Sequence, residues 1–482
     1  MVNRARPGAA LGLAVVSFVV GLYGVFCTTL LGLERAVGME ARTAAVIGGA
    51  AAAVVVLAAS RRGQLWDLMD RLLATVRRVS ARSWVLACIA VGFVLRATWV
   101  MVVPPIPTSD HLAYLTLAVN LVERGRFWLG HDCLYLPPGV SLALAPLIAA
   151  IGHSRLVALL FNLLLFAAAL PVSYLLARRL VGDDAARMSV ALLAVWPNLI
   201  MLAGFASKEL MVFALLPAVL LLTLQAAAAR SRWRLAWSAG AGLLLGAMVL
   251  TQPHAALLVP VLAAFEWLRG GPRRVALARL AVVMVAAGLA VLPWTVRNYL
   301  LSGQVVVVSA NGGHSLWVGN NPQATGGYVA VRPAWAELHE VAYDRAAAAW
   351  ALSWIRAHPG AFLRLVPRKQ ILYLGDDADG AYCSVKEGLG IRDVRYVVAK
   401  GSSNAYWIVV LGLAAMGVWG WRRELPAPAI ALLILPMLLQ LGLFSITESG
   451  GRHHVQLAAP LAILAALALT RPTSHGTGGG LT

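Results

Sequence analysis

The sequence predicts an all-α polytopic membrane protein with about 12 transmembrane helices and a smaller mixed α/β extracytoplasmic domain. Of its 482 residues, 60% are hydrophobic and only 13% are charged, whereas an ordinary soluble domain is about half apolar and about a quarter charged. The apolar residues also gather in runs of about 20, the length that crosses a bilayer as a helix. These observations exclude a soluble globular enzyme, a disordered chain and a fibrous protein.

Twelve apolar segments follow one another along the chain. The first begins after Arg4 and Arg6 and is too long for the apolar region of a signal peptide, so it is expected to be a transmembrane helix. The segments lie near residues 10–32, 43–60, 84–103, 155–177, 187–206, 209–228, 235–251, 254–268, 278–296, 404–421, 426–445 and 454–470.

The distribution of arginine predicts the orientation of these helices. The net charge of +19 would suit a nucleic-acid partner, but the basic residues form short clusters between apolar runs, as cytoplasmic loops do. With the N-terminus inside, every inner loop is basic, so a multi-pass protein without a nucleic-acid partner is expected. The inner clusters lie at residues 61–82, 178–187, 230–234, 269–279 and 422–423.

Two further segments are expected to lie in the membrane interface instead of crossing it. Pro137–Ile151 is apolar, but at about 15 residues it is too short to span. If it did span, the arginines that follow the next apolar run would move outside. Residues 61–83 place apolar side chains on one helical face among arginines. The alternative for this second segment is a solvated basic linker helix.

The same pattern divides the chain into four regions. Residues 1–83 hold two N-terminal transmembrane helices and the basic interfacial helix. Residues 84–296 form the transmembrane core, with a first large outer loop at 104–154. Residues 297–403 form the extracytoplasmic domain, which opens on the strand-like run QVVVVSANGG, and residues 404–482 form the last transmembrane helices and a short cytoplasmic tail.

The first outer loop carries a candidate general base. Asp110 follows a predicted span on a proline-rich approach, and His111 and Tyr114 come within one helical turn of it. A carboxylate at the membrane surface has low-dielectric surroundings on one side and access for a substrate on the other, which suits a base. The alternative is a helix cap, because Ser109 and Asp110 precede an amphipathic helix and Asp is a favoured capping residue.

Three more ionisable residues lie at or within apolar runs. Lys208 and Glu209 fall between two predicted spans with almost no loop, and Arg96 lies within the third span. Ionisable groups so close to hydrocarbon are costly and are usually paired or functional. For Arg96, pairing with a carboxylate or an outer anionic group is predicted. The alternatives are a turn in which Lys208 and Glu209 pair only with each other, and snorkelling of Arg96.

The segment after the ninth predicted span carries donors suited to phosphate and sugar. Arg297 and Asn298 leave this span at the outer face, and Asn320 and Asn321 follow in turns. A guanidinium holds phosphate through a fixed fork of donors, and asparagine amides bind sugar hydroxyls or phosphate. The alternative for the asparagines is turn chemistry, because Asn tolerates left-handed backbone conformations.

The outer turn between the last two spans is also polar, with Glu448, Arg452 and His453. The alternative here is a solvated turn, and adjacent histidines alone do not indicate a metal because neighbouring side chains point in different directions. No zinc, phosphate-loop or Ser/His/Asp motif is present, so no metal ligand is assigned. The spacing of the four cysteines indicates neither a metal site nor a disulfide framework. A single disulfide between Cys133 and Cys383 stays open.

Four segments together resemble the GT-C membrane glycosyltransferases, in the branch of the protein O-mannosyltransferases and the bacterial aminoarabinose–lipid A transferase. In order they are DHLAYLTLAVNLVERGRF, LPPGVSLALAPLIAAIG, PWTVRNYLLSGQVVVVSANGGHSLWVGNNP and ESGGRHHVQLAAP. Their order and spacing over residues 84–470 carry the resemblance. The chain departs from this pattern at Gln252, where relatives commonly have Arg, and at Lys208, where relatives often have no Lys beside the acidic residue.

The resemblance implies a transfer reaction at the extracytoplasmic face of the bacterial cytoplasmic membrane. The donor would be a polyprenyl-phosphate sugar held among membrane lipids, and the acceptor a lipid, a glycan or a protein. Asp110 would be the catalytic base of an inverting displacement, and Glu209 the second acidic residue.

The resemblance also implies which residues contact the substrates. Arg297 and Arg452 would hold the donor phosphate, whose charge grows as the bond breaks. The other predicted substrate-binding residues are His111, Tyr114, Arg96, Lys208, Asn298, Asn320, Asn321, Glu448 and His453. No cofactor is required, although a divalent metal ion stays open because some GT-C relatives use one.

Other classes of protein share part of this pattern. An O-antigen polymerase or ligase also has many spans and one large outer loop, but relies on arginines in that loop. A lipid or glycan transporter should show paired repeats and helices broken at mid-membrane, and the sequence shows neither. A receptor with an outer domain is the third alternative.

Overall fold

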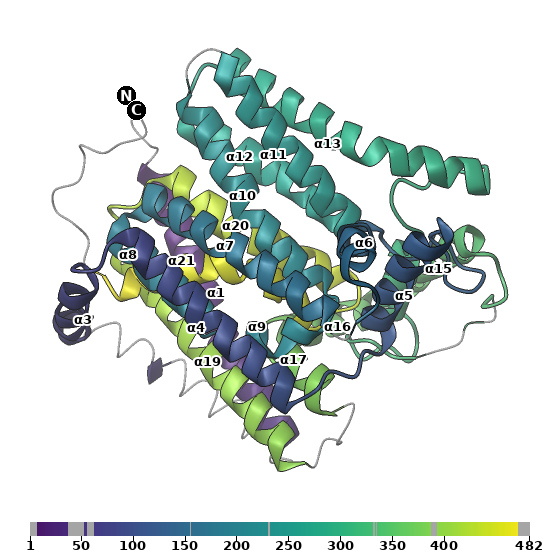
Figure 1. Ribbon diagram of the computed structural model, residues 1–482, viewed down its shortest axis with the longest axis horizontal. Helices are drawn as coiled ribbons and strands as arrows, with labels where there is room; N and C mark the ends of the chain where they lie inside the picture. The colour runs from purple at the N-terminus through teal and green to yellow at the C-terminus, as the bar shows by residue number, and fades with distance from the viewer. Residues whose placement is uncertain are drawn as a thin grey trace.

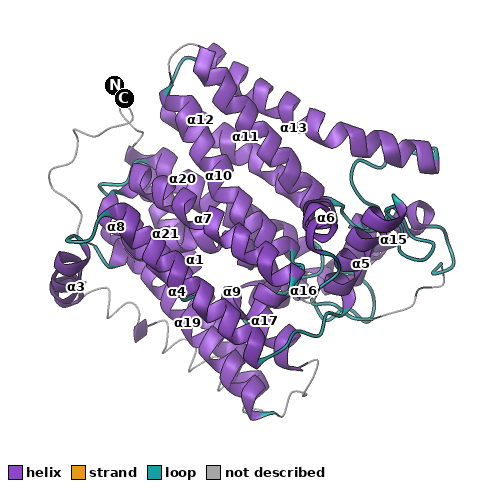
Figure 2. Ribbon diagram, viewed as in Figure 1, coloured by secondary structure: helices purple, strands orange, loops and turns teal. Residues whose placement is uncertain are grey.

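The computed structural model describes residues 7–36, 53–54, 62–154, 156–229, 232–330, 333, 335–386 and 393–470. Within these ranges the chain folds into helices joined by loops and has no β-strand (Figure 2). The nearest approach to a sheet is an isolated bridge between Leu129 and Asp132. The predicted all-α class is therefore confirmed.

Among the described residues, eight helices are long and apolar enough to cross a membrane. Each contains an apolar run of the predicted length, and Figure 1 shows them packed into one bundle. They are α1 (Pro7–Ala36), α4 (Ala81–Val102), α7 (Val157–Val181), α10 (Lys208–Ala228), α11 (Arg232–Thr251), α13 (Arg273–Ser302), α19 (Val394–Gly420) and α20 (Ala427–Ile446).

One predicted span is bent, and another lies outside the described residues. The segment predicted at 187–206 forms α8 (Asp183–Ala194) and, after a break, α9 (Pro197–Met201), with a bend of 47° between the two pieces. Pro197 explains the break, because proline has no N–H to continue the preceding helix but fits the first turn of a new one. The span predicted at 43–60 falls mostly outside the ranges that the structure describes.

Two more predicted spans are shorter helices that begin as 3₁₀ turns. The segment at 254–268 enters through η2 (Pro253–Leu257) and continues as α12 (Leu258–Arg269). The segment at 454–470 enters through η4 (Gly451–Leu457) and continues as α21 (Ala458–Ala468). Both 3₁₀ turns carry polar side chains close to the ends of the long spans.

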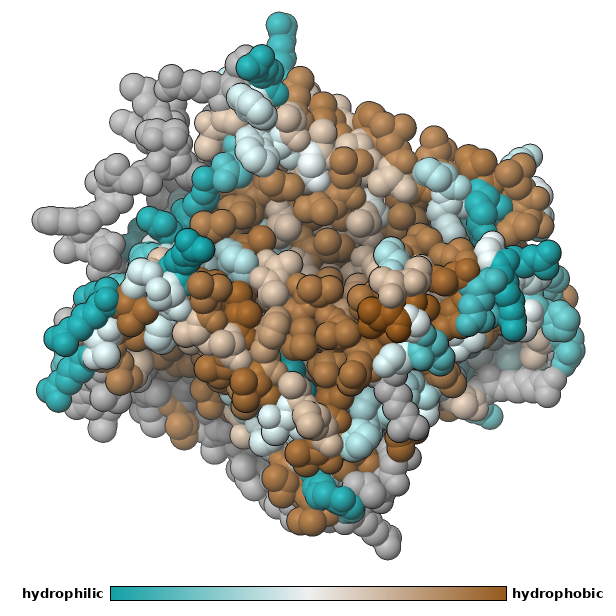
Figure 3. Space-filling model, in the orientation of Figure 1, coloured by the Kyte–Doolittle hydropathy of each residue, from teal (hydrophilic) through white to brown (hydrophobic). Residues whose placement is uncertain are grey.

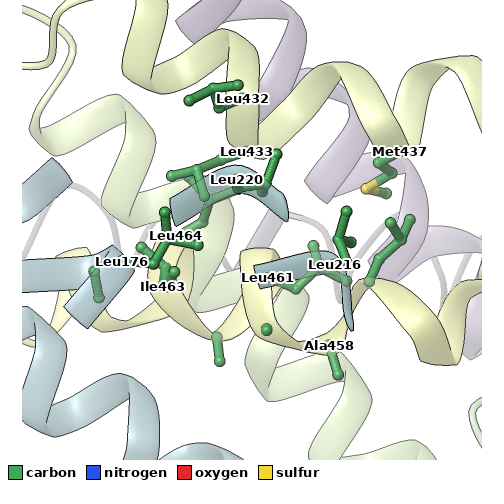
Figure 4. Close-up of a cluster of buried hydrophobic side chains, with 14 of the residues drawn as sticks. Leu176, Leu216, Leu220, Leu432, Leu433, Met437, Ala458, Leu461, Ile463 and Leu464 are labelled. Carbon is green, nitrogen blue, oxygen red and sulfur yellow. The ribbon is translucent and has the colours of Figure 1, made fainter. Parts of the chain in front are cut away.

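The centre of the bundle is a contiguous apolar core around α21. Every residue of α21 is buried, as expected of a helix that is hydrophobic on all sides. Figure 4 shows Leu461 and Leu464 of α21 beside Leu216 and Leu220 of α10 and Leu433 of α20. This packing holds the N-terminus of α10 and the 3₁₀ turn η4 in fixed positions.

The surface of the bundle is apolar where the long helices lie. Large apolar side chains such as Leu164, Leu243, Val285 and Leu289 are exposed, and Figure 3 shows a broad hydrophobic area with hydrophilic residues gathered toward its two sides. A soluble monomer rarely exposes so extended an apolar patch. The protein is therefore a multi-pass membrane protein.

Shorter helices lie at the two ends of the bundle. The amphipathic helix α3 (Arg62–Val76) lies at one end, on the left of Figure 1, and α5, α6 and α15 lie at the other. The short apolar helix predicted from Pro137 onward is α6. The helices at this second end are α5 (Ser109–Arg124), α6 (Gly139–Ile151), α14 (Gly312–Val318), α15 (Glu340–Ala357), α16 (Pro359–Leu374), α17 (Asp379–Ala381) and the π-helical turn η3 (Tyr382–Lys386).

The mixed α/β character expected of the outer domain is not seen in the described residues. Val306 and Val308 are buried while Val305 and Val307 are exposed, which is the alternation of a strand. Among the described ranges, no second strand pairs with this segment. The carbonyl oxygens of Val306 and Val308 instead accept hydrogen bonds from the Asn298 side chain, at 3.0 Å each. A side-chain amide at the end of α13 therefore satisfies the backbone that a partner strand would otherwise pair.

Candidate active site

A charged cluster lies where three elements from distant parts of the chain meet. Oδ2 of Asp110, on α5, is 3.3 Å from Nζ of Lys208, the first residue of α10. The same oxygen is 3.2 Å from Nη1 of Arg452, on η4. One carboxylate therefore has two cationic partners, close to the ends of apolar helices.

The start of α5 positions Asp110 in the first turn of a helix. The N-cap is Thr108, whose side chain makes no capping hydrogen bond, so Asp110 does not serve as the cap. Among the described residues, Ser109 is the one non-glycine residue with a positive φ, 47°, and such conformations cost energy and cluster at functional sites. The helix N-terminus adds partial positive charge near the Asp110 carboxylate.

The two cations set the ionisation of Asp110. The ammonium of Lys208, and after it the guanidinium of Arg452, hold the pKa of the Asp110 carboxyl well below its usual range, although burial acts in the opposite direction. Asp110 is therefore an anion at neutral pH. A lowered pKa also makes it a weak proton acceptor for as long as both cations stay in place.

Glu209 is turned away from its neighbour Lys208. The hydroxyl of Ser207 donates a hydrogen bond to Oε2 of Glu209 at 2.9 Å, and Nε2 of Gln252 lies 3.5 Å from Oε1. The same hydroxyl accepts from the Leu210 amide and so caps α10. The alternative of a self-contained Lys208–Glu209 pair is thus not what the structure shows.

Glu448 and His453 complete the cluster from the side of η4. Oε1 of Glu448 lies 3.9 Å from Nη2 of Arg452, and burial raises the pKa of Glu448. The ring of His453 stacks on Phe444 with centroids 4.0 Å apart, and burial lowers the pKa of His453 well below its usual value. The turn predicted here is therefore not simply solvated, because Glu448 and His453 are buried.

Several polar atoms around the cluster have no hydrogen-bond partner among the described residues. They belong to buried side chains, and buried polar groups are normally satisfied. Such atoms are therefore available to a ligand with hydroxyl or phosphate groups. They are Oη of Tyr114, Oε2 of Glu448, Nδ1 of His453, Oε1 of Gln252 and Oε1 of Gln456.

Arg297 and Asn298 do not join the cluster. Nη1 of Arg297 donates to the carbonyl oxygen of Cys133 at 2.7 Å, and Nη2 donates to that of Phe127 at 3.1 Å. The guanidinium also lies 4.5 Å from the centre of the Trp294 ring. These contacts tie the first outer loop to the end of α13.

The remaining predicted residues are also engaged elsewhere. Arg96 is buried in α4 and donates to the carbonyl oxygens of Gly92 and Ala194. Asn320 donates to the carbonyl of Ile446, and Asn321 donates to those of Trp317 and Val318. The alternative of snorkelling by Arg96 is excluded by its burial, at 2% exposure, and the partners found are backbone carbonyls instead of the predicted carboxylate.

Sequence reasoning missed two carboxylates that organise the loops around the site. Glu340 accepts hydrogen bonds from the backbone amides of Cys133, Leu134 and Tyr135, at 2.7 to 3.1 Å. Asp377 accepts from the Trp196 indole at 2.7 Å. Neither lies in an apolar run, so nothing in the sequence distinguished them from solvated acidic residues.

The cysteines predicted as a candidate pair are apart. No disulfide joins Cys133 and Cys383. Cys133 lies against Glu340, while Cys383 lies beside His111. With Asp379, these last two residues form the group of side chains that could hold a metal ion in the described part of the chain.

The fold and this cluster define a polytopic helical membrane protein with a charged, partly buried site at one end of its spans. The family model described as dolichyl-phosphate-mannose-protein mannosyltransferase matches residues 136–296. This match confirms the resemblance to the GT-C membrane glycosyltransferases that the motifs predicted. No significant match is found among curated proteins.

The chain is similar to two solved membrane-protein structures. The apo oligosaccharyltransferase of Archaeoglobus fulgidus has 12% sequence identity and a TM-score of 0.49, with 80% of this chain and 50% of that chain covered. ArnT from Cupriavidus metallidurans bound to undecaprenyl phosphate has 15% identity and a TM-score of 0.40, with 82% and 79% covered. This chain thus spans half the length of the oligosaccharyltransferase.

Proposed function

We propose that the protein is an integral-membrane glycosyltransferase that moves a sugar from a polyprenyl-phosphate donor to an acceptor at the extracytoplasmic face of the bacterial cytoplasmic membrane. The observation that carries this proposal is the Asp110 carboxylate between Lys208 and Arg452, close to the ends of apolar helices. A sugar carried on a lipid phosphate needs a base for the acceptor and cations for the phosphate at the bilayer surface. The matched mannosyltransferase family supports the same class.

In the proposed reaction an acceptor hydroxyl oxygen attacks the anomeric carbon of the donor sugar. Asp110 takes the hydroxyl proton as the new bond forms, and the bond from the anomeric carbon to the phosphate oxygen breaks. Polyprenyl phosphate leaves with the electron pair of that bond, and the anomeric configuration inverts. Lys208 and Arg452 stabilise the negative charge that grows on the leaving phosphate.

The double pairing of Asp110 suggests how the base is activated. Both cations contact the same carboxylate oxygen, Oδ2. A donor phosphate that contacts Lys208 and Arg452 competes with Asp110 for them, and each weakened contact raises the pKa of the carboxyl. The carboxylate is then a stronger proton acceptor when the donor is bound than when it is absent.

The unpartnered polar atoms are proposed to bind the substrates. Tyr114, Glu448 and His453 each present one such atom beside the charged pair, and sugar hydroxyls can both donate to and accept from these groups. Glu209, held by Ser207 and Gln252, is proposed to position the acceptor. Arg297 and the outer asparagines are proposed to act only through the loops that they hold.

A transfer assay tests the proposal directly. Protein in nanodiscs would receive radiolabelled polyprenyl-phosphate sugars and a membrane extract as the source of acceptor. The variant Asp110→Asn should lose transfer by about 100-fold to 10,000-fold, the usual contribution of a general base. Glu123→Gln is the matched control, because Glu123 is an exposed carboxylate on the same helix, and it should retain the wild-type rate.

Two outcomes would contradict the proposal. Full transfer by Asp110→Asn would rule out Asp110 as the general base. Absence of transfer from every donor, by wild-type protein that is folded and monodisperse, would contradict the reaction class and favour a polymerase or a transporter.

A further inference from the structure

Beside the charged cluster, three metal-binding side chains converge from two segments of the chain. His111 follows Asp110 on α5, and Asp379 and Cys383 belong to α17 and the π-helical turn η3. One ligand atom from each lies within 4.8 Å of the others. Nε2 of His111 is 3.6 Å from Sγ of Cys383, across a sequence separation of 272 residues. A thiol, an imidazole and a carboxylate thus face one point.

The second ring nitrogen of His111 fixes the direction of the first. Nδ1 lies 3.0 Å from the carbonyl oxygen of Ala206, and a carbonyl only accepts hydrogen bonds, so Nδ1 carries the proton. The lone pair of Nε2 is then directed toward Cys383. Histidines that bind metal ions are commonly oriented in this way, by a hydrogen bond from the other ring nitrogen to a backbone carbonyl or a carboxylate.

The distance between the ligand atoms of His111 and Cys383 matches that of a tetrahedral zinc site. Zinc bonds of about 2.3 Å to sulfur and about 2.0 Å to nitrogen place the two ligand atoms about 3.6 Å apart, which is the separation found here. The Asp379 oxygen lies within 4.8 Å of both of these atoms, so a small rotation of its side chain would bring it within bonding distance of a zinc ion that they hold. A thiolate ligand favours zinc over magnesium or calcium, which prefer oxygen ligands.

We propose that His111, Asp379 and Cys383 bind one Zn²⁺ ion, with a fourth coordination position left for water or a substrate oxygen. Asp379 and Cys383 are four residues apart, which places both side chains on one side of their turn. π-helical turns are rare and frequently occur at functional sites. The ion would tie η3 to α5 one residue from Asp110, and so limit the movement of that carboxylate.

A binding experiment on the full chain tests the site without any sugar donor. Untagged protein in detergent would be stripped with a chelator and titrated with Zn²⁺ against a chromogenic chelator, and the retained metal would be counted by elemental analysis. The wild type and the control Cys88→Ser should retain one zinc per chain. Cys383→Ser and Asp379→Asn should bind at least about tenfold more weakly, the lower limit seen when even an outer contact of a metal site is lost.

Cobalt supplies a second readout that reports the thiolate itself. Co²⁺ bound to a cysteine gives a sulfur-to-metal charge-transfer absorption, which should appear in the wild type and in Cys88→Ser and disappear in Cys383→Ser. Size-exclusion profiles confirm that each variant is folded. Equal zinc affinity in the wild type and Cys383→Ser, or a cobalt spectrum without the thiolate band, would overturn the proposal and leave only a thiol–imidazole hydrogen bond. Because no donor is used, this outcome is independent of the transfer assay.

Discussion

Replacing Gly451 by alanine tests how tightly the position of Arg452 is fixed. Gly451 begins η4 and directly precedes Arg452. A Cβ at this position would lie 1.7 Å from the backbone oxygen of Asp376, whereas real Cβ atoms essentially never come under 3.0 Å. The adjacent Gly450 has nothing within 4 Å of its Cβ position and has extended backbone, with φ −175°. Gly450→Ala is therefore a matched control.

The expected size of the effect follows from these distances. Relief of the clash requires a separation of about 1.3 Å between η4 and the Asp376 backbone. If Arg452 moves with η4, its 3.2 Å contact with Asp110 lengthens to about 4.5 Å. At an effective dielectric constant of about 20, the attraction between the two charges weakens by about 1.5 kcal/mol. Arg452 moves away from the leaving phosphate by a similar distance, so transfer should fall by about tenfold from the weaker stabilisation of that charge. The fall should reach about 100-fold if the reacting groups are also misplaced by about 1 Å.

Initial transfer rates in nanodiscs measure the effect, and thermal unfolding of the same samples separates it from loss of fold. Gly450→Ala should match the wild type in both measurements. The reasoning is refuted if Gly451→Ala transfers sugar at a rate within about twofold of Gly450→Ala. In that case η4 would tolerate the displacement, and the exact position of Arg452 would not matter to transfer.

Three further predictions concern the groups around the site. The Lys208 ammonium is the largest cause of the lowered pKa of Asp110. Lys208→Gln removes this ammonium and should therefore raise that pKa. Because the base form exists only above that pKa, the acid-side loss of kcat/KM should move to higher pH in a rate profile. Glu340→Gln, which disturbs three backbone amide contacts, should lower the free energy of unfolding by about 1.5–3 kcal/mol in thermal denaturation, whereas Glu123→Gln should not. Burial lowers the pKa of Lys369 to about 8, so the unfolded chain binds more protons above that pH. Stability should therefore rise as the pH increases from 8 toward the ordinary lysine pKa, and Lys369→Met should abolish this rise.

The fold was largely predictable because each long span is one uninterrupted apolar run. The shorter elements depend on backbone chemistry that hydropathy does not report. Pro197 and Pro253 each begin a new helical piece, so apolar runs that look continuous become a bent pair in one case and a 3₁₀ turn with a short helix in the other. The run around Val306 fails to form a strand because pairing needs a second strand, and the Asn298 amide takes that place.

The residues at the centre of the site stood out in the sequence because ionisable groups at the ends of apolar runs are costly. Lys208 was identified on that ground, Asp110 by its place at the membrane surface, and Arg452 by the polar outer turn and the family resemblance. The structure brings the three together. Their pairing could not be predicted. Glu209 was the obvious partner of Lys208 by proximity, but adjacent side chains on a helix do not face each other. Lys208 therefore pairs with Asp110, across the fold.

The predicted ligands that lie outside the cluster show where sequence reasoning reaches its limit. Arg297 and Asn320 carry the donors that phosphate and sugars need, but irregular outer loops also contain backbone carbonyls that must be satisfied. In this fold both side chains donate to such carbonyls. The same donor chemistry serves a ligand or a loop, and only the position of the backbone decides between them. His111 shows the converse, because its partner Cys383 is 272 residues away and no local pattern joins them.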